Sequence, residues 1–106
     1  MEKIYNKLVR DKIPQIINAN GEKAYTRVLN NSDYGKELCK KLQEEVAEFL
    51  QDESMEELAD VLEVVHGLLL YKGESFESLE KIRQQKYDKR GGFEQKIFLE
   101  KVDEKE

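Results

Sequence analysis

The fold is decided by residues 33–71, which read DYGKELCKKLQEEVAEFLQDESMEELADVLEVVHGLLLY. Apolar side chains recur in this stretch every three or four residues, which is the spacing of one face of an α-helix. The polar run DES interrupts the pattern, and its Ser54 forms with Glu57 the S-x-x-E capping box that opens a new helix. We therefore expect two helices, over residues 33–51 and 55–71, which a short turn makes antiparallel neighbours.

One glutamate stands inside the apolar stripe of the first of these helices. On a helical wheel Glu45 falls between Tyr34 and Leu38, and Glu48 lies at the edge of the same stripe. A glutamate among apolar side chains is costly unless it is paired with a cation or bound to a metal. Glu45 is therefore a candidate metal ligand. The competing interpretation is a buried salt bridge between Glu45 and a lysine or arginine.

The second helix is apolar on more than one face. Its main stripe consists of Leu58, Val61, Leu62, Val65 and Leu69. Further apolar side chains flank this stripe on both sides, and a helix of this kind is buried by more than one neighbour. We therefore expect an all-α antiparallel bundle of three to four helices, with this helix at the centre and a homodimer or larger homo-oligomer completing the core.

Weaker elements flank the helix pair on both sides. The sequence predicts a short helix over residues 13–18 with Asp11 as its N-cap, and another over residues 76–89 capped by Ser75. Residues 23–29 are rich in β-forming side chains and predict either a short strand or an extended arm.

Length and composition limit the class of protein. A chain of 106 residues has room for one domain, and we expect residues 1–106 to form it. The longest apolar run, residues 68–71, is far shorter than the roughly 20 residues of a membrane span. The start of the chain lacks the apolar segment of a secretory signal, and Cys39 is the only cysteine. These features predict a cytoplasmic location, with no membrane partner and no disulfide within the chain.

The net charge of −5 is unevenly distributed along the chain. Residues 33–63 carry three basic and eleven acidic side chains, whereas residues 1–32 carry six basic and three acidic ones. Residues 64–106 carry nine of each. A strongly basic face is absent from this pattern, so a nucleic-acid polymer is not an expected partner. The excess of acid coincides with the helix pair.

The acidic residues of the pair follow two short patterns. E-E-x-x-E stands at residues 44–48, and E-x-x-D stands at residues 57–60. Residues three apart lie on the same side of a helix, with Cβ atoms roughly 5–6 Å apart. Two antiparallel helices that turn these sides toward each other would gather four carboxylates around one point.

Four carboxylates at one point repel one another strongly, on the order of kilocalories per pair in contact. A hard divalent cation would neutralise them, and oxygen ligands suit Mg²⁺ or Mn²⁺. Because protein-bound Mg²⁺ commonly bridges carboxylates to phosphate, a metal here implies a phosphate ligand. The alternative is that the glutamates form an ordinary solvated helix face.

The same residues carry a family resemblance. E-E-x-x-E followed by E-x-x-D resembles the mark of the all-α nucleoside triphosphate pyrophosphohydrolases of the MazG and phosphoribosyl-ATP pyrophosphohydrolase kind. Within that superfamily the chain is most similar to a small branch whose members open like YNKLVRDKIP, here residues 5–14. Members of this branch also carry a late K-x-x-x-R-G-G-F, here residues 86–93. The three motifs occur in order and cover nearly the whole chain.

The resemblance implies an enzyme that uses Mg²⁺ to hydrolyse a nucleoside triphosphate to the monophosphate and pyrophosphate, with the clearing of non-standard nucleotides as its role. It implies Glu45, Glu48, Glu57 and Asp60 as the metal ligands. Glu44 is then the residue that orients the attacking water, with Glu45 also counted as catalytic. Only eight residues separate Glu48 from Glu57, fewer than in many MazG domains, and this shortens the turn. The alternatives are phosphoribosyl-ATP hydrolysis in histidine synthesis and a non-catalytic helical interaction module.

A triphosphate also needs cationic contacts away from the metal. Lys7, Arg10 and Lys12 form one basic cluster, and Lys86 and Arg90 belong to a second. We expect these side chains to bind substrate, above all the two arginines, because a guanidinium can hold phosphate through two hydrogen bonds. The ordinary alternatives are surface solubility and, for Arg90, a favourable interaction with a helix C-terminus.

Overall fold

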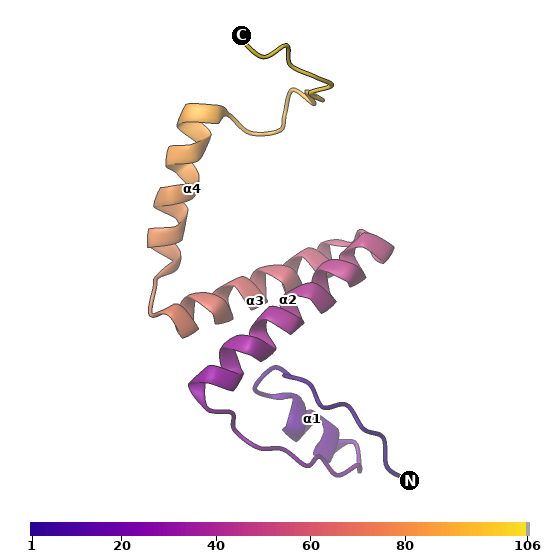
Figure 1. Cartoon of the computed structure of the whole chain (residues 1–106). Coiled ribbons are helices and arrows are strands. Elements are labelled where there is room, and N and C mark those ends of the chain that lie inside the picture. Colours follow the sequence, from indigo (N-terminus) through magenta and orange to yellow (C-terminus); the bar gives the residue numbers. More distant parts are fainter. Residues whose placement is uncertain (106) are drawn as a thin grey trace. The chain divides into compact units, whose positions relative to one another are not determined.

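The computed structural model describes residues 1–105 and contains four helices in that range. In chain order (Figure 1) they are α1 (Ile13–Ala19), α2 (Asn31–Asp52), α3 (Met55–Lys72) and α4 (Phe76–Arg90). No strand occurs in the described range, which confirms the all-α prediction and makes residues 23–29 an extended arm. A search of the same residues finds no helix with both the length and the apolar character to cross a bilayer.

The chain divides into two compact units, and each is described by itself. The first, Met1–Glu74, contains α1, α2 and α3, and the second begins at Ser75 and contains α4. In the second unit, Ser75 Oγ accepts a hydrogen bond from the backbone N–H of Ser78 at 3.0 Å, which confirms Ser75 as the cap of α4. The candidate metal ligands all belong to the first unit. One domain over residues 1–106 stays a prediction.

Local capping sets the limits of the central helix pair. Asn30 Oδ1 accepts a hydrogen bond from the N–H of Asp33 at 2.8 Å and begins α2. Ser54 Oγ accepts one from the N–H of Glu57 at 3.2 Å, so Ser54 caps α3 as predicted. Helix α3 ends at Gly73, whose φ of 70° is a conformation that glycine adopts without strain. The short turn between the helices makes them run antiparallel, side by side (Figure 1).

The prediction of Asp11 as the N-cap of α1 is wrong. The cap position is Lys12, which makes no side-chain capping bond, and Pro14 stands in the first turn. The N–H of Ile13 instead donates to the carbonyl oxygen of Arg10 at 3.1 Å. A backbone turn and the fixed φ of proline therefore start this short helix without a side-chain cap.

Helices α2 and α3 meet along a line that we call the interhelix seam. On α2 the buried residues are Gly35, Leu38 and Glu45. On α3 the seam contains Val64, which is buried, and Gly67, where an added Cβ would come within 2.9 Å of Leu38 Cδ2. The absence of a side chain at Gly67 therefore lets the two helices approach closely.

The apolar stripe predicted for α3 is only partly buried. Leu58 and Leu62 remain 45% and 48% exposed, whereas Val64, expected at the flank, is 7% exposed. The reason is that α2 packs against the side of α3 that carries Val64 and Gly67, where close approach is possible. Leu58 and Leu62 therefore face away from the seam.

Alanine at Gly67 tests this close approach. A Cβ there meets Cδ2 of the buried Leu38 at 2.9 Å, so an added methyl group overpacks the seam. Alanine favours a helix by about 1 kcal/mol over glycine, and overpacking costs about 1–3 kcal/mol. We expect G67A to lower the free energy of unfolding by ~1 kcal/mol, whereas the control Q43A, at an exposed position of α2, should leave it nearly unchanged. Urea denaturation measures both, and a stabilised G67A would contradict the close approach.

Candidate metal centre

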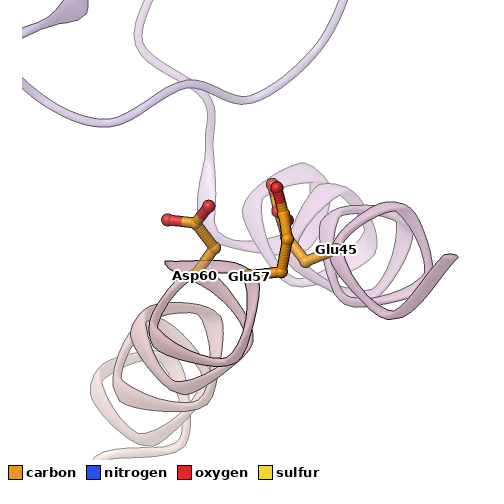
Figure 2. Close-up of side chains that lie close together, drawn as sticks. All are labelled: Glu45, Glu57 and Asp60. Carbon is orange, nitrogen blue, oxygen red and sulfur yellow. The ribbon is translucent and has the colours of Figure 1, made fainter. Parts of the chain in front are cut away.

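Three acidic side chains from α2 and α3 meet on one side of the helix pair (Figure 2). Glu45 comes from α2, and Glu57 and Asp60 come from the beginning of α3. Each offers one carboxylate oxygen, and these oxygens all lie within 4.8 Å of one another. A single divalent ion with bonds of roughly 2.0–2.6 Å could bridge such oxygens. We call these residues the three-carboxylate group.

The seam itself brings these carboxylates together. Along α2, Glu45 follows Leu38 by seven residues, and along α3, Glu57 precedes Val64 by seven, so each acid lies two turns along the same helix face. Because the helices are antiparallel, the continuation of one face meets the continuation of the other. The packing that buries Leu38 and Val64 therefore forces Glu45 and Glu57 to face each other.

The carboxylate of Glu45 is buried and only partly satisfied. Glu45 is 7% exposed, and its Oε2 atom has no hydrogen-bond partner among the described residues. The Oε2 atom of Glu57 is buried and unpartnered in the same way. An unsatisfied buried polar atom costs about 1–3 kcal/mol, and more when it is charged. Two such atoms from facing helices could therefore accept a positively charged ligand.

The electrostatic surroundings of these glutamates point the same way. Burial raises the pKa of Glu45, and the neighbouring Glu48 raises it further, while Lys41 acts in the opposite direction. Burial also raises the pKa of Glu57; Glu48 opposes this shift, and the charges of Asp60 and Glu45 add to it. Both shifts mean that the folded protein disfavours the ionised carboxylates. A bound cation would reverse that preference.

Basic side chains neutralise part of the negative charge of the carboxylates at this site. Lys41 Nζ lies 3.2 Å from Glu44 Oε2 and 3.4 Å from Glu45 Oε1. Lys7 Nζ lies 3.2 Å from Glu44 Oε1. The competing interpretation of Glu45 as half of a salt bridge is thus realised at one oxygen only. The second oxygen is left for another ligand.

Glu44, which precedes Glu45 in the sequence, has a pKa shifted in the opposite direction. Although burial raises the pKa of Glu44, hydrogen bonds from Lys41 and Lys7 outweigh that effect and hold the pKa below its ordinary value. Glu44 therefore carries a stable negative charge beside the three-carboxylate group. This arrangement suits a residue that accepts a hydrogen bond from water, and its role as the orienting residue stays a prediction.

The predicted ligand Glu48 lies outside the three-carboxylate group. Glu48 is exposed, but its side chain lowers the pKa of Glu57 across the helix pair. The carboxylate of Glu48 is still close enough to raise the pKa of Glu45. The structure brings together three of the four predicted carboxylates, those of Glu45, Glu57 and Asp60, and the role of all four as metal ligands stays a prediction.

The predicted substrate-binding residues separate into two sets. Lys7 and Arg10 contact the acids, the second through a 2.6 Å ion pair between an Arg10 guanidinium nitrogen and Asp60 Oδ1. Lys12 is exposed, and Lys86 and Arg90 are exposed on α4 in the second unit. The roles of these three residues stay predictions.

The sequence reasoning did not identify Lys41 as part of the site. Its signal is present in the sequence, since Lys41 precedes Glu44 by three residues and Glu45 by four, the spacings at which side chains of a helix meet. The pairing of Lys41 with Glu45 lies at the edge of the interhelix seam and is partly shielded from solvent. The side chain of Lys41 is only 17% exposed.

Comparisons with protein-family models, with curated proteins and with solved structures find no match to this chain. The family resemblance therefore stays a prediction that rests on the three motifs. The chemistry of the site can be argued independently of it. Hard oxygen ligands from two helices, beside cations that can meet an anion, suit the binding of a divalent ion together with a phosphate.

Glutamine at position 45 should stabilise the ion-free protein. The variant removes a buried charge with an unsatisfied oxygen and loses only the contact with Lys41, so we expect a gain of about 1 kcal/mol at pH 7, or roughly 4–8 °C in Tm. Since the pKa of Glu45 is raised by folding, the penalty should vanish as the pH falls through that raised pKa toward the ordinary value.

Thermal unfolding in chelator at several pH values measures this difference. The matched control is E63Q, which removes the same charge from an exposed position on α3 and should leave Tm nearly unchanged. A Tm of E45Q below that of the wild type at pH 7 would show that Lys41 already compensates Glu45.

Proposed function

We propose that this protein is a Mg²⁺-dependent nucleotide pyrophosphohydrolase, with Mn²⁺ as an alternative ion. The observation that carries the proposal is the pair of buried, unpartnered oxygens of Glu45 and Glu57, together with Asp60 in one group. A Mg²⁺ ion bound by only a few carboxylates keeps coordination positions for water and for phosphate oxygens. The motif resemblance supports the reaction class, in which a nucleoside triphosphate gives the monophosphate and pyrophosphate.

The residues of the site divide the work of such a reaction. A divalent ion, when bound, polarises phosphoryl oxygens and lowers the pKa of a coordinated water. Glu45, Glu57 and Asp60 would hold it. Glu44, whose charge Lys41 and Lys7 stabilise, would orient a water molecule. The oxygen of that water would form a bond to phosphorus as the P–O–P bond to the leaving pyrophosphate breaks, and the proton that the water loses would pass to solvent.

We also propose that two copies of the chain complete the bundle as a homodimer. The buried hydrophobic residues of the described chain are only Leu38 and Val64. Leu58 and Leu62 leave an apolar strip on α3 outside the seam, and Leu50 on α2 is 70% exposed. A second copy would bury such a strip by a self-complementary contact.

We place the protein in the cytoplasm, as the sequence predicts. Cys39 is exposed and free, a state that a reducing compartment maintains. Nucleotides are also abundant there as substrates.

A panel of ribo-, deoxyribo- and damaged triphosphates, with Mg²⁺ and pyrophosphate release as the readout, tests the proposed reaction. We expect at least one nucleotide to release pyrophosphate, and E45Q to lose roughly 100-fold or more in rate, on the order of 3 kcal/mol in barrier. E63Q should keep the wild-type rate. Complementation of a strain that lacks phosphoribosyl-ATP hydrolysis separates the histidine-synthesis alternative.

The non-catalytic alternative makes the opposite prediction in the same experiments. It expects no pyrophosphate from any nucleotide and no rise in Tm when Mg²⁺ is added. A fully active E45Q would instead leave the reaction in place and remove Glu45 from the metal centre.

The dimer is tested by size-exclusion chromatography with light scattering. We expect twice the chain mass for the wild type and the monomer mass for L62E, because a charge in the apolar strip opposes its burial. The control V28E changes a residue that is 98% exposed on the extended arm and should remain dimeric. A monomeric wild type would refute the dimer.

A further inference from the structure

A short N-terminal segment crosses the acidic side of the helix pair. We call residues 7–10, Lys7-Leu8-Val9-Arg10, the N-terminal strap. At one end Lys7 contacts Glu44 of α2 at 3.2 Å, and at the other Arg10 contacts Asp60 of α3 at 2.6 Å. Asp60 belongs to the three-carboxylate group, so the positively charged side chain of Arg10 in the strap pairs with one of the candidate metal ligands.

The backbone of the strap is held while the Arg10 side chain remains accessible. Leu8 and Val9 are half-buried, and the carbonyl oxygen of Arg10 accepts the hydrogen bond from the N–H of Ile13 that starts α1. The side chains of Arg10 and Asp60 are 54% and 37% exposed. Ion pairs this open to solvent are weak, so a ligand can replace the guanidinium without moving the strap.

Arg10 and a divalent ion need the same carboxylate. With Arg10 in place, one oxygen of Asp60 is occupied by the guanidinium, whereas Glu45 and Glu57 keep unpartnered oxygens. An ion that takes all three carboxylates places its charge beside the guanidinium and repels it. A guanidinium released next to the ion is well placed to bind a phosphate, which it can hold through two hydrogen bonds.

We propose that Arg10 is an exchangeable counter-cation. It holds Asp60 in the ion-free protein, leaves when a divalent ion binds, and then binds the polyphosphate that shares the ion. This inference rests on the proposed function and goes beyond it, since it couples the two binding events. By linkage, the ion strengthens polyphosphate binding, and the polyphosphate strengthens ion binding by the same factor.

The test compares the wild type with R10Q in two titrations at fixed pH and ionic strength. The first measures the affinity for Mn²⁺ alone, and the second measures the affinity for inorganic pyrophosphate at saturating Mn²⁺. We expect R10Q to bind Mn²⁺ roughly two- to five-fold more tightly, because it removes the competitor. We expect it to bind pyrophosphate roughly 10-fold more weakly, because the guanidinium is missing.

Two further variants separate this exchange from a general effect of charge. R27Q removes the same charge from an exposed position on the extended arm and should change neither affinity by more than about two-fold. R10K keeps the charge without the planar fork, so it should retain the wild-type Mn²⁺ affinity and still lose pyrophosphate affinity. Thermal unfolding checks that each variant is folded.

The opposite changes in the two affinities are the signature of exchange. An R10Q variant that binds Mn²⁺ no better than R27Q overturns the competition for Asp60. An R10Q variant that binds pyrophosphate as tightly as the wild type overturns the second step. Either result leaves the proposed function intact if the wild type hydrolyses a nucleotide and E45Q does not. Absence of Mn²⁺ binding in both the wild type and R10Q overturns the metal centre and the exchange together.

Discussion

The structure depends on one constraint, which is that the seam that packs α2 against α3 also contains their carboxylates. Leu38 and Val64 are buried by the same helix faces that bring Glu45 and Glu57 together. The helices cannot rotate to expose Glu45 without also exposing Leu38. Apolar burial therefore works against electrostatic repulsion, and a cation bound at the three-carboxylate group would reduce that repulsion.

This constraint would also couple the proposed ion binding to the stability of the fold. A core whose buried hydrophobic residues in the described chain are Leu38 and Val64 is small, and it leaves little to offset an unsatisfied buried charge. An ion that binds only the folded state adds stability in proportion to the logarithm of its concentration over its Kd. Burial of Leu58 and Leu62 by a second copy would contribute apolar surface on the other side of α3. A bound ion would thus compensate the unsatisfied buried charge of the helix pair, and a dimer would enlarge its small apolar core.

The sequence predicts what depends on local chemistry and misses what depends on tertiary geometry. The caps at Ser54 and Ser75 are visible in the sequence because a hydroxyl and a nearby N–H form them, and Glu45 is conspicuous among apolar neighbours. The side of α3 that α2 covers was missed, since it depends on the missing side chain of Gly67 fitting against Leu38. The pairing of Arg10 with Asp60, 50 residues apart, is likewise set by the path of the chain and has no local pattern.

Glu44 and Glu45 are adjacent in sequence, yet the fold gives them opposite electrostatic environments. Lys41 and Lys7 hold the pKa of Glu44 low despite its partial burial, while burial and Glu48 raise the pKa of Glu45 against the single contact with Lys41. Environments that push apart the pKa values of neighbouring acids are typical of sites where the acids have different tasks. A purely solvated acidic face would treat both glutamates alike. The contrast therefore favours a site in which Lys41 and Lys7 keep Glu44 charged, whereas a cation from outside the chain would be needed to keep Glu45 charged.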